Sequence, residues 1–390
     1  MLTRLDRRTL LAGSLLIGAS GLAFPRIALA QGSGTRNLLF VLLRGAADGL
    51  SMLAPVGDPG LEALRGPSLA DYDNAPRIGS FFALHPAFAE VGKVAAAGEA
   101  LFVHAAATAY RERSHFDGQN LLETGGNATY ATKDGWLNRL AALLAETHKG
   151  EVPRALAVAP AVPLALRGEA PVSSYAPSSL PDASADFLAR VAGLYDGDAE
   201  LSGLWSRALE TRAMASDDGL RNLNDASANG ALVASLMKGP KGARIAMIEI
   251  DGWDTHANQR FAFARQARGL DALLAAYRSG MGEDWADTLV LVATEFGRTA
   301  RFNGTNGTDH GTAGAAMVLG GGVRGGRVVA DWPGLAASQL YQGRDLAPTI
   351  ALERVLAGAV AAHFRLDPAL AMARLFPGRG AQPLAGMLKT

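Results

Sequence analysis

Residues 248–256 read Ile-Glu-Ile-Asp-Gly-Trp-Asp-Thr-His, and they continue an apolar run that begins at residue 245. The run 245–250 has the length and composition of a buried β-strand, and the Asp-Gly pair after it is typical of a turn. Two carboxylates, Asp251 and Asp254, then precede His256. In open α/β sheets, ligands bind beyond the carboxyl ends of the strands. The stretch therefore predicts a strand of such a sheet and part of its functional edge.

Similar apolar runs recur along the chain and alternate with segments of helical periodicity. We expect strands at residues 37–43, 100–106, 154–158, 244–250 and 288–294, with a further apolar segment at 315–319. We expect helices at about residues 86–97, 135–147, 257–278 and 350–363. Strands that are apolar throughout are typical of a mainly parallel sheet with helices on both faces. The predicted fold class is therefore α/β.

The remaining segments lie between these elements. Residues 54–80 are rich in Pro, Gly and Asp, which predicts a long loop with little regular structure. The pattern from about residue 183 to 236 is mostly helical, and a proline-rich loop precedes it. We therefore expect a helical cap or insertion at about residues 160–236, within a single α/β domain that covers residues 31–390.

The composition excludes several classes of protein. With 390 residues, 49% of them hydrophobic, the chain can bury a large core. Lys plus Arg and Asp plus Glu number 37 each, so no overall basic charge indicates binding to nucleic acid. The absence of cysteine excludes disulfides, thiolate catalysis and thiolate metal sites. Any metal must be bound through oxygen and imidazole nitrogen.

The first 30 residues have the features of an export signal. Arg7 and Arg8 precede an apolar stretch that runs to about Phe24, and residues 28–30 (Ala-Leu-Ala) offer a small-residue cleavage site. The segment resembles a twin-arginine signal, which predicts a periplasmic or secreted protein. An ordinary signal peptide or a short membrane anchor is the alternative. No other segment has the roughly 18 uninterrupted apolar residues of a spanning helix, so we expect no membrane span after cleavage.

Polar side chains that can carry chemistry follow four of the predicted strands. They are Asp48, Ser114 with His115, the group from Asp251 to His256, and Glu295, and the loop after the last strand adds Asp309 and His310. Histidine nitrogen and carboxylate oxygen are standard ligands of zinc and manganese where sulfur is absent. The repetition of these groups at one edge of one sheet predicts a divalent-metal site there.

Each of these groups also has a purely structural explanation. Asp48 could form a turn with Gly49, and Ser114 could cap a helix, because Asp117 lies three residues further on. A capping serine can also be a nucleophile, since a helix N-terminus stabilises an anionic substrate. Asp254 or Thr255 could cap the helix expected from residue 257. Glu295 could form an ion pair with Arg298, and Asp309 with His310 could form a solvated turn.

The other histidines and the glycine-rich segment are expected to be structural. His85, His148 and His363 lack polar neighbours in the sequence and are interpreted as surface or packing residues, and His104 lies inside a strand and is interpreted as a core residue. The glycines at 320–322 are not followed by the Gly-Lys-Ser/Thr of a phosphate-binding loop, which favours a tight turn.

Five segments together resemble the DUF1501 family of exported bacterial proteins of unknown function. The segments are residues 43–50 (LRGAADGL), 114–117 (SHFD), 252–256 (GWDTH), 294–299 (TEFGRT) and 307–311 (GTDHG). The similarity covers nearly the whole chain, including the export signal. The family is grouped with the alkaline phosphatase and sulfatase superfamily. The resemblance therefore implies a three-layer, alkaline-phosphatase-like sandwich with a site for one or two metal ions.

The resemblance also implies a role for each segment. Ser114 occupies the place of the superfamily's nucleophile. Asp48 resembles its first-strand aspartate, which together with Glu295 would hold a second metal ion. Asp251, His256 and His310 resemble the superfamily's ligands of the first metal ion.

Two features depart from the superfamily's pattern. Glu295 falls where an Asp-His pair follows the strand, and Phe296 stands where the histidine ligand of that pair is expected. The spacing from Asp251 to His256 is one residue longer than the usual Asp-x-x-x-His, so Asp254 competes with Asp251 as a ligand. One metal ion and two metal ions remain alternatives.

The expected function is that of a metal-dependent hydrolase that acts outside the cytoplasm on a phosphate or sulfate ester or a related small anionic substrate. Ser114 is the expected nucleophile and Zn or Mn the expected cofactor. Arg44, Arg113 or Arg298 could clamp the oxygens of the anion. The alternative is a catalytically degraded protein of the same fold that binds a cell-envelope glycan or a partner protein. A structural calcium site is a third possibility, because oxygen-rich clusters suit a hard cation.

Overall fold

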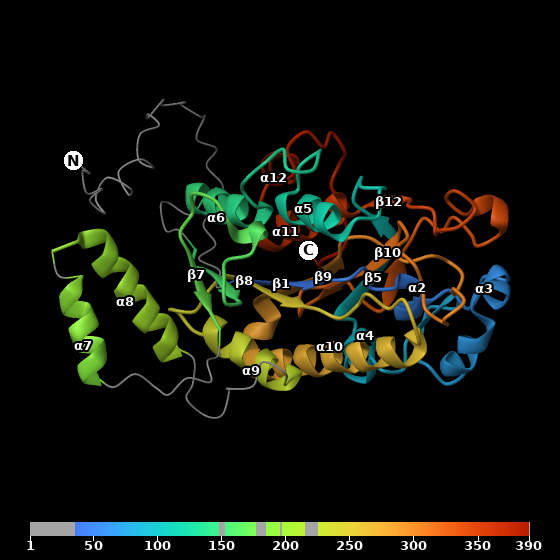
Figure 1. Cartoon of the computed structure of the whole chain (residues 1–390), viewed down its shortest axis with the longest axis horizontal. Helices are drawn as coiled ribbons and strands as arrows, with labels where there is room; N and C mark the ends of the chain where they lie inside the picture. Colours follow the sequence, from blue (N-terminus) through green and yellow to red (C-terminus); the bar gives the residue numbers. More distant parts are fainter. Residues whose placement is uncertain (1–35, 148–152, 177–184, 196, 215–224, 390) are drawn as a thin grey trace, which may run out of the picture. The chain divides into compact units, whose positions relative to one another are not determined.

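In the computed structural model, which describes residues 36–147, 153–176, 185–195, 197–214 and 225–389, the apolar runs form the strands of one nine-stranded sheet (Figure 1). The expected signal segment and His148 lie outside the described residues. The strands are β1 (Asn37–Leu43), β5 (Ala100–Ala107), β6 (Ala155–Val158), β7 (Val172–Tyr175), β8 (Ile245–Ile250), β9 (Thr288–Thr294), β10 (Gly314–Leu319), β11 (Arg327–Val329) and β12 (Ile350–Ala351). Their order is β11-β5-β10-β9-β1-β8-β6-β7, and β12 also pairs with β5.

One strand of this sheet runs against the others. The neighbours of β1 are β8 and β9, and both pair with it in parallel, whereas β10 pairs antiparallel with β5 and with β9. The fold is therefore mixed α/β with a mainly parallel sheet, which confirms the predicted class. Because β10 is reversed, its amino end lies at the edge where the carboxyl ends of β1, β5, β8 and β9 lie.

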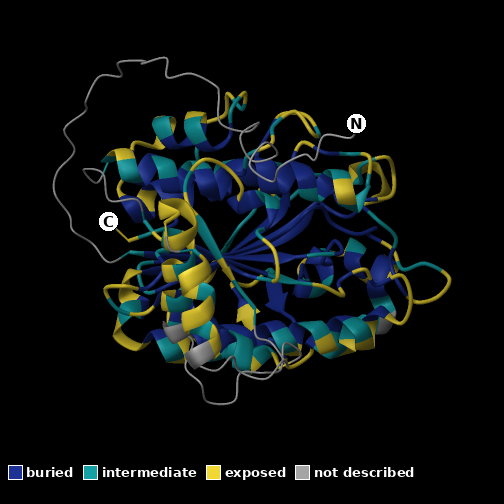
Figure 2. Cartoon of the chain, turned by 60° about the vertical axis from the view of Figure 1, so that its left-hand side comes forward, coloured by how far each residue is buried: buried dark blue, intermediate teal, exposed yellow. Residues whose placement is uncertain are grey.

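Both faces of the sheet are covered, which explains why the strands are apolar throughout. The ring of Phe40 in β1 packs edge-on against Trp136 on one face, with 5.2 Å between the ring centroids. Its neighbour Val41 belongs to the cluster on the other face, because successive side chains of a strand point in opposite directions. Figure 2 shows the buried strands between two helical layers with exposed outer surfaces.

The helices divide between the two faces. Figure 1 shows α5 (His115–Thr124), α6 (Trp136–Thr147), α11 (Leu352–Phe364) and α12 (Pro368–Leu375) above the sheet, and α4 (Ala89–Ala96), α9 (Ala226–Met237) and α10 (Gln259–Met281) below it. Each layer has its own hydrophobic core cluster, one containing Trp136 and the other Phe263.

The prediction of a long irregular loop at residues 54–80 is wrong. This part of the chain forms helix α3 (Gly60–Leu69), a 3-10 turn, and a small sheet of β2 (Leu53–Ala54), β3 (Arg77–Ile78) and β4 (Phe82–Leu84). Leu61 and Leu64 are one helical turn apart and pack with Leu335 in a third core cluster. Tertiary packing of these side chains outweighs the abundance of Gly and Pro, which favours turns.

Residues 160–236 contain both layer elements and additional helices. Strand β7 extends the main sheet beside β6, and the buried side chains of α9 belong to one of its core clusters. Helices α7 (Ala185–Leu194) and α8 (Ala199–Met214) instead carry the exposed residues Phe187, Leu194 and Leu204. Among the described residues, the structure has no helix with both the length and the apolar character to cross a bilayer.

Three histidines are buried packing residues. His104 in β5 stacks on Phe82, and His85 contacts Phe263 edge-on. Burial lowers the pKa of each of these two histidines to about 4. Burial also lowers the pKa of His363, in α11, to about 3.

Candidate metal centre

The five segments singled out in the sequence meet at one edge of the sheet. Strands β5, β10, β9, β1 and β8 are consecutive neighbours. The loops that leave β1, β5, β8 and β9 therefore lie next to one another, and the loop that enters the reversed β10 returns to the same edge. Backbone hydrogen bonds join these loops, for example from the amide of Thr308 to the carbonyl of Thr255 at 3.0 Å.

Three histidines and one aspartate, which we call the histidine cluster, converge there: His115, Asp254, His256 and His310. The Nε2 atoms of His115 and His256 lie 2.9 and 3.0 Å from Nε2 of His310. Oδ1 of Asp254 lies 3.0 Å from Nε2 of His256, and its Oδ2 lies 3.4 Å from Nε2 of His115. Ligand atoms of His115, Asp254 and His310 all lie within 4.8 Å of one another, so this group could hold a metal ion.

The other ring nitrogen of each histidine contacts a hydrogen-bond acceptor. The Nδ1 contacts are His115 to Glu295 at 2.8 Å, His256 to Asp309 at 3.2 Å, and His310 to the carbonyl of Arg113 at 2.8 Å. A proton on each Nδ1 satisfies these contacts and leaves the Nε2 lone pairs of His115 and His256 close to Nε2 of His310. Metal-ligating histidines characteristically donate their outer N–H to a carboxylate or a carbonyl in this way. The donor set therefore fits a divalent cation.

Glu295 is a buried support for His115. Burial raises the pKa of Glu295, but hydrogen bonds from His115, from the amide of Gly45 and from the hydroxyl of Thr294 outweigh it, so the pKa is lower than usual. The hydrogen bond to Glu295 in turn raises the pKa of His115. The carboxylate contacts the outer face of the ring, so Glu295 orients His115.

Arg298 holds Asp254 and the loops around it. Its guanidinium is almost fully buried and bonds the Asp254 carboxylate. It also donates to the carbonyls of Ala46 at 2.9 Å, Thr308 at 3.0 Å, Gly45 at 2.9 Å and Trp253 at 3.1 Å. Burial raises the pKa of Asp254, but the bond from Arg298 prevails and keeps that pKa low. Because Arg298 is directed at protein acceptors, it positions Asp254 instead of clamping a substrate.

The backbone next to the cluster is strained. Arg113 has a φ of 62°, which is uncommon for a residue with a side chain, and its carbonyl accepts the hydrogen bond from His310. Its guanidinium is fixed by Asp345, with Nε and Nη2 at 3.0 and 2.8 Å from Oδ2. A Cβ atom at Gly45 would lie 2.5 Å from the amide nitrogen of Asp254, so this crossing of two loops requires glycine. Such strain persists only where surrounding contacts enforce it.

Asp48 is buried outside the cluster and is engaged by other groups. Its carboxylate pairs with Arg65, with Oδ2 and Oδ1 at 2.6 and 3.2 Å from the guanidinium, and accepts from Ser51 at 2.7 Å and from Gln259. It also caps the short helix α2 (Gly49–Met52). Sequence reasoning did not single out Arg65, because this residue lies in the segment expected to be a loop.

The other sequence-predicted residues occupy three different environments. Ser114 is the N-cap residue of α5 and directly precedes His115, and its side chain makes no cap hydrogen bond. Asp251 is exposed and lies outside the cluster. Arg44 bonds Glu123 at 2.8 Å as well as Glu249 and Gln119.

His115 was expected at this edge of the sheet together with Ser114, but it was not among the predicted metal ligands. Phe296 lies beneath its ring, nearly parallel, with 5.0 Å between the centroids. A Cβ atom at Gly118 would lie 2.9 Å from the Phe296 ring, so the first turns of α5 fit closely over it. Phe296 therefore provides an apolar surface against which the His115 ring packs.

A family model described as "Protein of unknown function (DUF1501)" matches residues 105–376, a range that contains the whole histidine cluster. No curated protein matches the sequence. Three solved structures show a distant likeness. The crystal structure of Ps i-CgsB in complex with k-i-k-neocarrahexaose is 10% identical and has a TM-score of 0.42, over 85% of this chain and 72% of that one.

The C-terminal periplasmic domain of EcEptC from Escherichia coli, in complex with Zn, is 10% identical with a TM-score of 0.33, over 76% of this chain and 77% of that one. The phosphonate monoester hydrolase of Agrobacterium radiobacter is 14% identical with a TM-score of 0.23, over 76% of this chain and 70% of that one.

Proposed function

This chain belongs to the DUF1501 family of proteins of unknown function, and from its site we propose that it is a metal-dependent hydrolase of phosphate or sulfate esters or related anionic substrates. The observation that carries the proposal is the convergence of three Nε2 atoms and one carboxylate, each held from outside by a further group. The reaction class, ester hydrolysis, is proposed from the family's resemblance to the phosphatase and sulfatase superfamily. A bound cation would also attract an anionic ester.

His115, Asp254, His256 and His310 would hold one ion, and imidazole with carboxylate favours Zn or Mn over Ca. When bound, such an ion supplies Lewis acidity to an ester oxygen. A single ion is favoured because Asp48 is neutralised by Arg65, and Glu295 contacts the outer nitrogen of His115. Both Asp251 and Asp254 are exposed, but Asp254 is the one whose carboxylate contacts His115 and His256, so we assign the carboxylate ligand to Asp254.

Ser114 is the proposed nucleophile. It adjoins His115, its hydroxyl is not used as a helix cap, and the first amides of α5 provide a positive helix end for an anion. The Ser114 oxygen forms a bond to phosphorus or sulfur, the ester bond to the alcohol breaks, and the serine proton ends on the released alcohol. Water then cleaves the bond to Ser114, which regenerates the hydroxyl and releases the inorganic anion.

We further propose that the protein acts outside the cytoplasm, in the periplasm or as a secreted protein. The resemblance of residues 1–30 to a twin-arginine signal supports this location.

The test is metal analysis combined with ester hydrolysis. We expect protein stripped of metal and then supplemented with Zn or Mn to bind about one ion per chain and to cleave p-nitrophenyl phosphate or p-nitrophenyl sulfate. His310→Ala should lose the ion. Ser114→Ala should keep it but lose about 10³-fold or more in kcat, whereas the exposed Ser227→Ala is the matched control.

The outcomes distinguish the alternatives. If no ion binds after supplementation, the metal site is wrong. If one ion binds but neither ester is cleaved, the protein fits the alternative of a catalytically inactive protein that binds a cell-envelope glycan or another partner. If Ser114→Ala retains full turnover, the nucleophile is not Ser114.

A further inference from the structure

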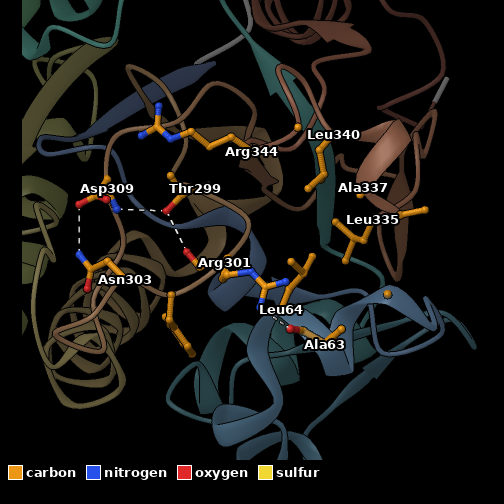
Figure 3. Close-up of a pocket in the computed structure, with 14 residues that line it drawn as sticks. Ala63, Leu64, Thr299, Arg301, Asn303, Asp309, Leu335, Ala337, Leu340 and Arg344 are labelled. Carbon is orange, nitrogen blue, oxygen red and sulfur yellow. Dashed lines mark hydrogen bonds between the residues drawn. The ribbon is translucent and has the colours of Figure 1, made fainter.

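A pocket of about 470 Å³ is lined by two residues, Asp309 and Arg344, that contact members of the histidine cluster (Figure 3). Asp309 lines the pocket, and its Oδ1 contacts Nδ1 of His256. Arg344 also lines it and donates to the carbonyl of His310 at 2.8 Å. The pocket is therefore connected to the cluster through Asp309 and Arg344, each of which contacts one of its histidines. The volume is within the range typical of small-molecule sites.

Two arginines of the pocket differ from the others near the site. Arg298 and Arg65 are buried and directed at protein acceptors, whereas Arg301 and Arg344 are exposed. One N–H of Arg301 donates to the carbonyl of Ala63 at 2.9 Å. Arg344 donates through Nη2 to the carbonyl of His310, and its Nε lies 3.7 Å from the carboxylate of Asp345. A guanidinium has five N–H donors, so both groups keep donors for an anionic ligand.

The pocket has a polar side and an apolar side. Figure 3 shows Asp309, Asn303 and Thr299 facing Leu335 and Leu340 across the opening. Asn303 donates to the Asp309 carboxylate at 3.1 Å, and that carboxylate also contacts His256, so the single acidic group of the pocket is already bound. A ligand would thus meet two guanidiniums, the Asp309 carboxylate with its contacts to Asn303 and His256, and an apolar wall.

We propose that this arginine pocket (Arg301, Arg344, Leu335, Leu340 and Asp309) binds the alcohol part of the substrate and selects one that carries a second anionic group and an apolar face. The substrate class is then a bis-anionic ester, with one anion at the histidine cluster and a carboxylate, sulfate or sulfonate on the alcohol part at Arg301 or Arg344. This inference rests on the proposed function for the identity of the first anion. The preference of the pocket for an amphipathic anion is inferred only from the residues that line it.

Binding is tested first without any turnover. The probe is 2-naphthalenesulfonate, which has an apolar face and one anion, compared with neutral 2-naphthol and with inorganic sulfate. We expect the sulfonate to bind at least about tenfold more tightly than either, as measured by naphthalene fluorescence and by calorimetry. Arg301→Gln should weaken sulfonate binding about tenfold and leave 2-naphthol unchanged, and Arg301→Lys should restore part of the affinity because it keeps the charge.

Three results would overturn the proposal. They are equal affinity for the sulfonate and 2-naphthol, no effect of both Arg301→Gln and Arg344→Gln, and inorganic sulfate binding as tightly as the sulfonate. The last result would mean that the apolar wall contributes nothing. Arg301 is exposed and contacts no member of the cluster, so Arg301→Gln should keep the metal content and the thermal unfolding temperature of the wild type.

A second measurement separates this inference from the proposed function. His115 contacts Asp254, Glu295, Phe296 and His310, none of which lines the pocket, so His115→Ala should disrupt the cluster but retain sulfonate binding. If the wild type binds no metal and cleaves no ester but binds the sulfonate, the proposed reaction fails and the pocket assignment survives. If it cleaves 2-naphthyl phosphate and its 6-sulfonate derivative with equal kcat/KM, and Arg301→Gln does not change that ratio, the pocket assignment alone fails.

Discussion

Nδ1 of His115 lies 2.8 Å from a carboxylate oxygen of Glu295, and this contact determines where His115 directs its other ring nitrogen. Glu295 follows directly after β9, the strand next to β1, whereas His115 is the first residue of α5. Two segments that are 180 residues apart in the chain are thus coupled at the site. The imidazole rests on Phe296, so its plane and its hydrogen bond are fixed by consecutive residues of one loop.

We expect Glu295→Gln to weaken Zn binding at the histidine cluster by about 10–100-fold, because partners of the outer histidine nitrogen orient the ring and increase its basicity. The glutamine has nearly the same volume, so the fold should be retained. Affinity is measured by competition with a chromogenic chelator. The exposed Glu62→Gln is the control and should bind Zn as the wild type does. An unchanged affinity in a folded Glu295→Gln protein would remove Glu295 from the site.

The assignment of the carboxylate ligand gives a matched pair of variants. Asp254→Asn should lower Zn affinity strongly, because it removes a charged ligand and leaves Arg298 without its ion-pair partner. Asp251→Asn changes an exposed residue in the same loop and should have little effect. Both are measured by the same chelator competition and by circular dichroism. The reverse order of effects would assign the ligand to Asp251.

The long central strands of the sheet could be predicted from the sequence with near-residue accuracy, whereas the short strands β7, β11 and β12 were not predicted. The apolar runs at 37–43, 245–250 and 288–294 coincide with β1, β8 and β9, because a strand buried on both faces is apolar at every position. The same pattern also predicted at which edge of the sheet the functional groups lie, because the carboxyl ends of parallel strands lie on one side. The helix at 60–69 was missed because Leu61 and Leu64 are buried by distant residues such as Leu335.

The identity of the cluster members was less predictable, because it depends on side-chain directions. Gly252 has a φ of 93° and lies between Asp251, which is outside the cluster, and Asp254, which bonds Arg298. His115 lies beside Ser114 in the sequence, but its direction depends on the start of α5 and on Phe296. Periodicity contains no information on such contacts between loops.

Arg298→Lys should destabilise the protein and also weaken the ion site. Lysine retains the charge, but it cannot reach the carbonyls of Ala46, Gly45 and Thr308 together. Each buried carbonyl left without a donor costs about 1–3 kcal/mol, so we expect a loss of at least about 2 kcal/mol in the free energy of unfolding. Urea unfolding of metal-free protein measures this loss.

The exposed Arg268→Lys is the control for that measurement and should unfold like the wild type. A metal-free Arg298→Lys protein as stable as the wild type would contradict the role of Arg298 in joining the loops.

The buried His363 should make the protein sensitive to mild acid. Burial lowers its pKa to about 3, against about 6.5 in an unfolded chain, and its Nε2 donates to the carbonyl of Asn37 at 3.0 Å. Between these two values the unfolded state binds a proton that the folded state does not. Stability is therefore fully present above about pH 6.5 and falls by up to about 1.4 kcal/mol per pH unit below it. The variant His363→Gln keeps a hydrogen-bond donor but does not titrate. Its free energy of unfolding, measured with urea, should therefore fall less steeply than that of the wild type between pH 6.5 and 4. Above pH 7.5 the two curves should be parallel. Parallel curves over the whole range would show that His363 does not contribute to the acid sensitivity.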